Sequence, residues 1–228
     1  MESKDLVLYD FCGTLVDFQT ANAYVNYVIS RKGLKKNMTD YARSIFNRLH
    51  LMPLLNRFHK RMSVNKSMLL YRLKGSSYQE MDAYAREFYE ACIKPHLVQP
   101  IVTRLRNDIE SGKVVAIVSG GYDIYIKYFA AEYNVPNLLS TSLLFENGEF
   151  SGHIKKCDCM GCEKVRRLSD YFHTENVLNV FGEVTGYSDS ESDLPMLLAC
   201  SRRVVVLQNN SIPDWAGRIG AGVIINDC

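Results

Sequence analysis

Short apolar runs and longer amphipathic stretches alternate along the chain. Continuous apolar runs such as Leu6 to Tyr9 are typical of parallel strands that are covered on both faces. The same reasoning, applied along the whole sequence, predicts five strands, at residues 4–11, 114–118, 176–184, 203–207 and 222–226.

From about residue 18 to residue 94 the pattern is helical. Apolar residues such as Ile45, Phe46 and Leu49 recur at spacings of three and four, which is the period of an amphipathic helix. This stretch predicts a helical insert between the first two strands.

A second helical stretch, residues 122–133, directly follows the strand predicted at 114–118. Residues 138–154 alternate around Asn147-Gly148, a pair that favours the tight turn of a β-hairpin. Strands separated by helices predict an α/β fold with a doubly wound, Rossmann-like, mainly parallel sheet.

The length of 228 residues, 47% of them hydrophobic, allows one well-buried core and a smaller satellite. We therefore expect an α/β core formed by residues 1–17 and 96–228. Residues 18–95, called the insert below, would form the helical satellite.

The bulk properties restrict the class of protein only loosely. A formal net charge of +2 selects no partner, and no stretch approaches the roughly 18 apolar residues of a membrane span. Seven cysteines without a secretion signal favour reduced thiols over a disulfide framework. We expect a soluble cytoplasmic protein, and the sequence carries no signal for its oligomeric state.

The first candidate for chemistry is Asp10, which opens the segment DFCGTL directly after the first predicted strand. A carboxylate at the C-terminal end of a parallel strand lies where open α/β sheets bind ligands. Gly13 permits a tight turn, and Thr14 offers a hydroxyl and an amide to phosphate oxygens. A turn-capping aspartate explains this short segment about equally well.

Ser119, Gly120 and Lys164 are further candidates for binding an anion. Ser119 and Gly120 offer a hydroxyl and amides at a strand-to-helix junction, although serine is also a common helix cap. Lys164, at the start of a predicted helix, could neutralise a phosphate, although most lysines are solvated surface residues.

An acidic segment, SDSESD at residues 188–193, follows the strand predicted at 176–184. Carboxylates such as those of Asp189 and Asp193 are hard oxygen ligands of the kind that Mg²⁺ prefers. An acidic, serine-rich helix start would give the same composition.

Together these segments resemble the four motifs of the haloacid-dehalogenase superfamily, in the order in which that family carries them. The spacing of the last three, and residues 159–165, look most like the phosphoserine-phosphatase branch. The resemblance spans the chain apart from the insert, which it implies to be a cap over the site. The matched positions are Asp10, Gly13, Thr14, Leu15, Ser119, Gly120, Gly121, Gly161, Lys164, Val165, Asp189, Asp193 and Leu194.

The resemblance implies that Asp10 is the nucleophile of a phosphatase and forms an aspartyl-phosphate, which water then hydrolyses. It also implies Mg²⁺ as the cofactor. The metal ligands would be the carboxylates of Asp10 and Asp189 and the backbone carbonyl of Cys12.

The same resemblance implies that Ser119 and Lys164 hold the transferring phosphoryl group and that Asp193 orients Lys164. The residue types themselves add Thr14 and Gly120 as candidate phosphate-binding groups, and the charge of Lys164 could also neutralise the Asp10 carboxylate.

Cys12 departs from the family pattern, in which an aspartate two residues after the nucleophile serves as general acid and base. Such catalysis is typically worth roughly 100- to 10,000-fold in rate, and sulfur is a poor hydrogen-bond donor. Either the leaving group needs no strong acid, or another residue or the substrate supplies the proton, or the protein is slow or specialised for phosphoryl transfer.

The insert is strongly basic. Between Arg31 and Lys74 there are twelve lysines and arginines against one acid, Asp40. This charge could steer a small anionic metabolite or make peripheral contact with a membrane, and solvated helix faces explain it equally well. No nucleic-acid partner is expected.

A Cys₃His zinc site is a minor alternative for His153, Cys157, Cys159 and Cys162, whose spacing matches no standard pattern closely. The phosphatase resemblance already accounts for residues 159–164.

The leading functional prediction is a Mg²⁺-dependent phosphatase that acts on a small phosphate monoester. The resemblance favours phosphoserine-like esters or other phosphorylated alcohols and amino alcohols as substrates. The cysteine at position 12 also resembles that of phosphatases associated with surface-polysaccharide precursors, which are a further candidate substrate class. Phosphotransfer through the same intermediate, or a degenerate member that binds anionic partners through its basic insert, are the alternatives.

Overall fold

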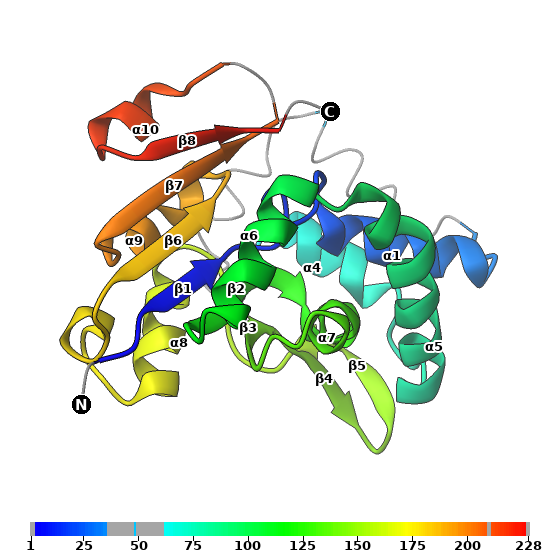
Figure 1. Cartoon of the computed structure of the whole chain (residues 1–228). Helices are drawn as coiled ribbons and strands as arrows, with labels where there is room; N and C mark the ends of the chain where they lie inside the picture. The colour runs from blue at the N-terminus through cyan, green and yellow to red at the C-terminus, as the bar shows by residue number, and fades with distance from the viewer. Residues whose placement is uncertain (1–2, 36–47, 49–61, 209–210, 227–228) are drawn as a thin grey trace.

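The computed structural model describes residues 3–35, 48, 62–208 and 211–226. Six strands pair in parallel, in the order β3-β2-β1-β6-β7-β8 (Figure 1). The strand order reverses at β1, so the sheet is doubly wound and the predicted fold class is confirmed. The strands are β1 Leu6–Tyr9, β2 Val114–Tyr122, β3 Asn137–Thr141, β6 Val184–Ser188, β7 Arg202–Leu207 and β8 Gly222–Ile225.

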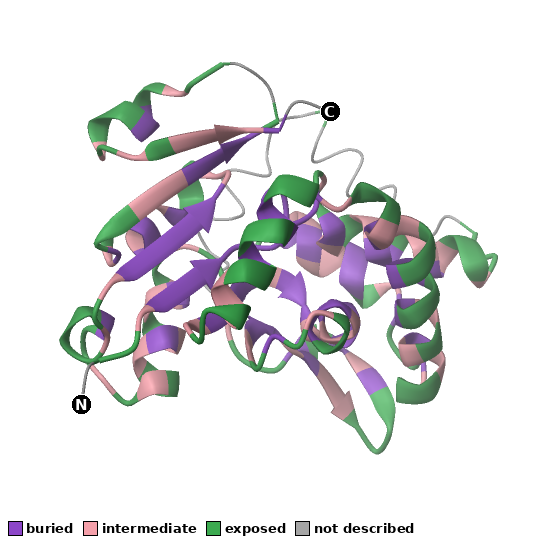
Figure 2. Cartoon of the chain, viewed as in Figure 1, coloured by how far each residue is buried: buried purple, intermediate pink, exposed green. Residues whose placement is uncertain are grey.

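Helices cover both faces of the sheet (Figure 1). Side chains alternate along β1, so that Val7 and Tyr9 join the hydrophobic cluster under α6 and α7, while Leu6 and Leu8 join the cluster under α8 and α9. Burial on both faces is the reason for the continuous apolar run, and β1 and β6 are buried throughout (Figure 2). These helices are α6 Gln99–Glu110, α7 Asp123–Glu132, α8 Cys162–Phe172 and α9 Leu194–Leu198, and a short α10 Asp214–Arg218 packs against β7.

The described part of the insert is helical and lies beyond the carboxyl end of β1 (Figure 1). Tyr24 and Phe88, from its first and last long helices, belong to the same cluster as Val7 of the sheet. The insert therefore packs directly on the sheet. Its helices are α1 Thr20–Arg31, α4 Val64–Tyr71 and α5 Tyr78–Phe88, followed by a π-helical turn, Tyr89–Ile93, and a 3₁₀ turn, Lys94–His96.

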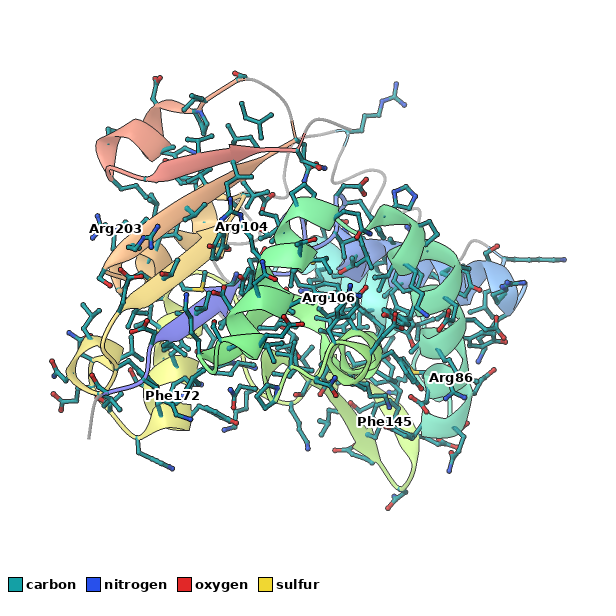
Figure 3. The ribbon with its side chains drawn as sticks, viewed as in Figure 1. Arg86, Arg104, Arg106, Phe145, Phe172 and Arg203 are labelled. Atoms are coloured by element: carbon teal, nitrogen blue, oxygen red, sulfur yellow. The ribbon has the colours of Figure 1, made fainter. Side chains whose placement is uncertain are left out.

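Polar contacts fix α5 of the insert to α7 of the sheet layer. Asp82 accepts hydrogen bonds from Lys127 and from the hydroxyl of Tyr128. The Arg86 guanidinium lies over the Tyr128 ring, 5.7 Å from its centroid, and Figure 3 shows Arg86 on α5. The insert boundaries at residues 18 and 95 stay a prediction.

The strand predicted at 176–184 is wrong. Residues Val177–Asn179 form a 3₁₀ turn that begins at Asn176, whose side chain accepts from the Leu178 amide, and β6 begins only at Val184. The sequence pattern did not reveal β6 because this strand contains Gly186. A Cβ at Gly186 would lie 2.7 Å from Cys200 Sγ of the adjoining layer. Close approach of that layer requires glycine, which weakens the apolar signal of the strand.

The hairpin predicted at 138–154 is only partly right. Residues Asn137–Thr141 are β3, an edge strand of the parallel sheet, and the hairpin consists of β4 (Leu143–Glu146) and β5 (Glu149–Ile154). Asn147 and Gly148 form its turn with positive φ angles of 51° and 83°, as the Asn-Gly signal predicts.

Candidate active site

The strand ends bring the predicted site residues together. β1 lies between β2 and β6, so Asp10 after β1, Ser119 within β2 and Asp189 after β6 meet at the carboxyl edge of the sheet. They line one cavity of about 160 Å³. Of the other predicted site residues, Cys12, Gly120, Lys164 and Asp193 line the same cavity, and Thr14 does not.

A buried cation joins two carboxylates at the bottom of this cavity. Lys164, at the start of α8 and 2% exposed, donates to Asp10 Oδ1 at 2.7 Å and to Asp193 Oδ2 at 2.6 Å. The Ser188 hydroxyl also donates to Asp193 Oδ2, at 2.7 Å. Burial by itself lowers the pKa of Lys164, but the two carboxylates outweigh it and raise that pKa, so the ammonium stays charged. The geometry therefore fixes Lys164 against Asp10.

Asp10 and Asp189 are both held in an environment that disfavours their negative charge. Burial raises the pKa of Asp10 to about 6. The Lys164 ammonium lowers this pKa and partly offsets the effect of burial, and repulsion from Asp193 raises it again. Burial, Asp10 and Asp193 raise the pKa of Asp189 to about 7. Asp189 Oδ1 is buried without a hydrogen-bond partner among the described residues. An unpartnered oxygen beside a second carboxylate is an environment that a bound cation would relieve, so these residues fit a Mg²⁺ site.

Gly13 keeps the loop that follows β1 close to Asp189. Its φ is +79°, and a Cβ built there would lie 2.0 Å from Asp189 Oδ2. Glycine is therefore required by the backbone conformation and also by the carboxylate that lies against it. The loop is further tied to the end of β7, because Gln208 after this strand donates to the Gly13 carbonyl at 2.9 Å.

Cys12 Sγ lies at the end of a buried hydrogen-bond chain. Its partner is Thr20 Oγ1 at 2.9 Å, which in turn lies 2.8 Å from the hydroxyl of Tyr125. Because the Tyr122 amide donates to Tyr125, the tyrosine hydroxyl proton is available for Thr20. Burial and the neighbouring Asp10 raise the pKa of Cys12 and favour the thiol over the thiolate.

Ser119 has its hydroxyl oriented by the backbone behind it. The Gly121 amide donates to Ser119 Oγ at 3.1 Å, and Cys12 Sγ lies 3.9 Å away on another side. Thr14, by contrast, is fully buried, and its hydroxyl has no partner among the described residues. A role of Thr14 in phosphate binding stays a prediction.

Sequence reasoning missed the residues that the insert and the acidic loop contribute to the cavity. Those from the insert follow no chemical motif, and only the position of α1 shortly after Asp10 could have pointed to some of them. Met160, Ser190 and Ser192 lie within segments named above, but no role was assigned to their side chains. Lys66 was counted merely as part of the basic stretch. The additional lining residues are Gln19, Ala21, Asn22, Ser63, Asn65, Lys66, Met160, Ser190 and Ser192.

The four candidate zinc ligands are not gathered. Among the described residues, no group of three or more His, Cys, Asp or Glu side chains is arranged to hold a metal ion, so the structure gives the zinc alternative no support. Cys159 is buried with its thiol toward the Leu139 carbonyl, whereas Cys162 is exposed on α8. All six described cysteines are free thiols, in agreement with the predicted reduced state.

Five of the twelve basic residues between Arg31 and Lys74 lie outside the described residues, namely Lys36, Arg43, Arg57, Lys60 and Arg61. Within the described part, Lys32 pairs with Glu80 and Lys66 pairs with Asp158. No helix among the described residues is long and apolar enough to cross a membrane.

Comparison with known proteins relates the chain to hydrolases and phosphatases. The model of the haloacid dehalogenase-like hydrolase family matches residues 7–198. A histidinol-phosphatase of Neisseria meningitidis serogroup C (strain 8013) is 24% identical over an alignment of 220 residues that covers 89% of this chain and 90% of that protein.

Two solved structures show the same fold. A protein of unknown function from Bordetella pertussis Tohama I has a TM-score of 0.78 at 24% identity, covering 97% of this chain and 98% of its own. A phosphoserine phosphatase with an analogue of the phospho-aspartyl intermediate has a TM-score of 0.61 at 15% identity, covering 100% of this chain and 95% of its own.

Proposed function

Since the chain belongs to the haloacid dehalogenase-like hydrolase family, we propose that it hydrolyses a small phosphate monoester through a phosphoryl group carried on Asp10. The observation that carries the proposal is the buried triad in which Lys164 contacts both Asp10 and Asp193. A packing role alone does not explain why three charged groups line a cavity together with Ser119 and Asp189.

In the first step, a carboxylate oxygen of Asp10 attacks phosphorus. The bond between phosphorus and the ester oxygen breaks, its electron pair stays on the ester oxygen, and this oxygen takes a proton from solvent to leave as the alcohol. Lys164 stabilises the charge on the phosphoryl oxygens, and the Ser119 hydroxyl and the Gly120 amide donate to them. In the second step, water attacks the phosphorus, which regenerates the Asp10 carboxylate and releases inorganic phosphate.

The charges of the cavity support a divalent cation as cofactor. Asp10, Asp189 and Asp193 face the ammonium of Lys164, and a phosphate monoester adds further negative charge. Asp10, Asp189 and the backbone carbonyl of Cys12 would hold Mg²⁺. The bound ion supplies positive charge to the phosphoryl oxygens. Lys164 and Ser119 then orient the phosphate for in-line attack by Asp10.

The lining of the cavity supports a small polar substrate. Neutral polar side chains, Asn22 and Ser63 among them, surround the charged centre. The names of the two similar phosphatases denote phosphate esters of serine and of histidinol, which both carry an amino group. We therefore propose a phosphorylated amino alcohol or a related alcohol as substrate, with the insert as the cap that selects it.

A phosphate-release screen tests this proposal. The purified protein is incubated with phosphoserine, histidinol phosphate, other alkyl phosphates and an aryl phosphate, with Mg²⁺ or with a chelator. Mg²⁺-dependent release from at least one alkyl phosphate is the expected result. No release from any of them, under conditions in which the protein is folded, would exclude the phosphatase.

Asp189→Ala is expected to raise the Mg²⁺ concentration needed for half-maximal phosphate release by at least roughly tenfold, because one charged ligand is lost. The measurement is a Mg²⁺ titration of phosphate release. Glu191→Ala is the control, since this exposed acid lies in the same loop and outside the cavity. Superimposable titrations of Asp189→Ala and wild type would remove Asp189 from the ligand set.

Gly13→Ala is expected to reproduce the raised Mg²⁺ requirement, because the added methyl group must displace the Asp189 carboxylate. Gly112→Ala is a matched control, because Gly112 has the same φ of +79° and no atom within 4 Å of its Cβ position. Both variants should lose about 1–2 kcal/mol of unfolding free energy from backbone strain. A normal Mg²⁺ response in Gly13→Ala would show that the close approach has no functional role.

A further inference from the structure

Lys66 is a buried cation that reaches the candidate site from the insert. It lies on α4, is 8% exposed, and donates from Nζ to the Gly120 carbonyl at 2.7 Å. It also donates to both carboxylate oxygens of Asp158, at 2.7 and 2.8 Å. An ammonium has three hydrogens, so these acceptors engage all of them and leave none for a ligand.

The surroundings of Lys66 fix its position. Asp158, also 8% exposed, accepts a further hydrogen bond from Thr141 Oγ1 at 2.7 Å. The Lys66 ammonium lies 5.0 Å from the centroid of the Tyr122 ring. A buried ion pair adds little net stability, because desolvation offsets the Coulomb attraction. Stability alone is therefore a weak reason for a lysine at this position.

The acceptor of Lys66 connects it to the predicted phosphate-binding hydroxyl. The Gly120 carbonyl belongs to the same peptide group as the Gly121 amide, and that amide donates to Ser119 Oγ at 3.1 Å. A cation on the carbonyl polarises the peptide and strengthens the hydrogen bond that its N–H donates. Because the Ser119 oxygen accepts this bond, its own proton is directed elsewhere.

Neighbouring side chains lie close to both glycines. A Cβ on Gly120 would lie 2.7 Å from the Met160 side chain, and one on Gly121 would lie 2.8 Å from Tyr125 and Ile126. The peptide between them is therefore enclosed on both sides, and Lys66 contacts its carbonyl from the insert.

We propose that Lys66 is a positioning residue for phosphate binding. It acts through the Gly120–Gly121 peptide, which orients the Ser119 hydroxyl to donate to a phosphoryl oxygen. The inference rests on the proposed function of Ser119 as a phosphate ligand. It also implies that the phosphate loop is complete only when α4 of the insert lies on the sheet.

The test uses inorganic phosphate as the ligand, measured by calorimetry in the presence of Mg²⁺. The central variant is Lys66→Met combined with Asp158→Asn, which removes the cation and keeps the net charge of this buried pair at zero. It should bind phosphate roughly tenfold more weakly, the size expected when a hydrogen bond to a charged group is lost. Asp158→Asn alone retains the ammonium on Gly120 and should bind at least as well as wild type.

Lys155→Met is the control for removing a lysine. Lys155 is exposed, lies outside the cavity, and should have no effect on phosphate affinity when it is replaced. Combining Lys66→Met with Asp158→Asn also guards against misfolding, since no unpaired charge is left buried. Wild-type phosphate affinity in this double variant would overturn the inference.

A double-mutant cycle with Ser119→Ala separates positioning from a general electrostatic effect. If Lys66 acts through Ser119, its removal should weaken phosphate binding less than twofold once the hydroxyl is absent. Equal losses with and without the Ser119 hydroxyl would overturn the inference and leave the phosphatase proposal intact. If wild type neither binds inorganic phosphate nor releases it from any ester, the proposed function fails and the inference fails with it.

Discussion

Asp10→Asn is expected to abolish phosphate release to below about 0.1% of wild type. The amide keeps the shape of the side chain and still accepts a hydrogen bond from Lys164, but it cannot attack phosphorus or supply a charged metal ligand. The measurement is phosphate release from the best substrate of the screen, at saturating Mg²⁺. Asp170→Asn on α8 is the control, because this carboxylate is exposed and lies outside the cavity.

The same variant should be folded. A carboxyl whose folded-state pKa is raised to about 6 contributes stability below its unfolded pKa and loses it as the pH rises through the folded value. At pH 7 without metal, the Asp10→Asn variant, which is neutral at this position, should therefore unfold at the same temperature as wild type or a higher one. Phosphate release above about 1% of wild type in a folded Asp10→Asn protein would mean that another group is the nucleophile.

Cys12→Asp is expected to raise the hydrolysis of alkyl phosphates by roughly 100-fold or more, if protonation of the leaving alcohol limits turnover. Position 12 lines the cavity and contacts Thr20, which can also donate to a carboxylate. The thiol is a weak donor, so a carboxyl group there would supply the missing acid. Aryl phosphates leave as stable anions, and their hydrolysis should barely change.

Cys12→Ser is the matched comparison, because a hydroxyl is no better as an acid at pH 7 and preserves the backbone carbonyl. Alkyl and aryl phosphatase activities are measured side by side for all three proteins. Equal alkyl phosphatase rates in all three would show that protonation at residue 12 does not limit turnover. If Cys12→Asp were inactive on both substrate types, the cysteine would have a positive role, such as avoiding another negative charge near Asp10.

The structure gives the thiol a defined environment that the sequence did not reveal. Cys12, Thr20 and Tyr125 form a hydrogen-bond chain that is closed by the Tyr122 amide. Thr20 is the first residue of α1, so the insert takes part in positioning this side chain. In this respect Thr20 resembles Lys66, which contacts the Gly120 carbonyl from α4 of the same insert.

Parts of the fold could be predicted because their signals are local. The apolar run Leu6–Tyr9 is continuous because both faces of β1 are covered, and the Asn147-Gly148 turn follows from positive φ angles that these residues tolerate. The position of β6 was predicted wrongly because the strand contains Gly186. Glycine is needed there because Cys200 packs closely against it, and a contact with a residue distant in the sequence produces no local apolar pattern.

The sequence by itself determined the α/β class, the family resemblance that the family match confirms, and the candidate residues at the strand ends. These features can be recognised from the sequence alone because each motif is short and directly follows a strand whose apolar pattern is local. Only the tertiary structure decided which distant residues meet, such as Lys66 with Asp158 and Thr20 with Cys12. Such contacts depend on strand order and on how the insert packs on the sheet. The residue type at one position therefore does not indicate which other residue it will contact.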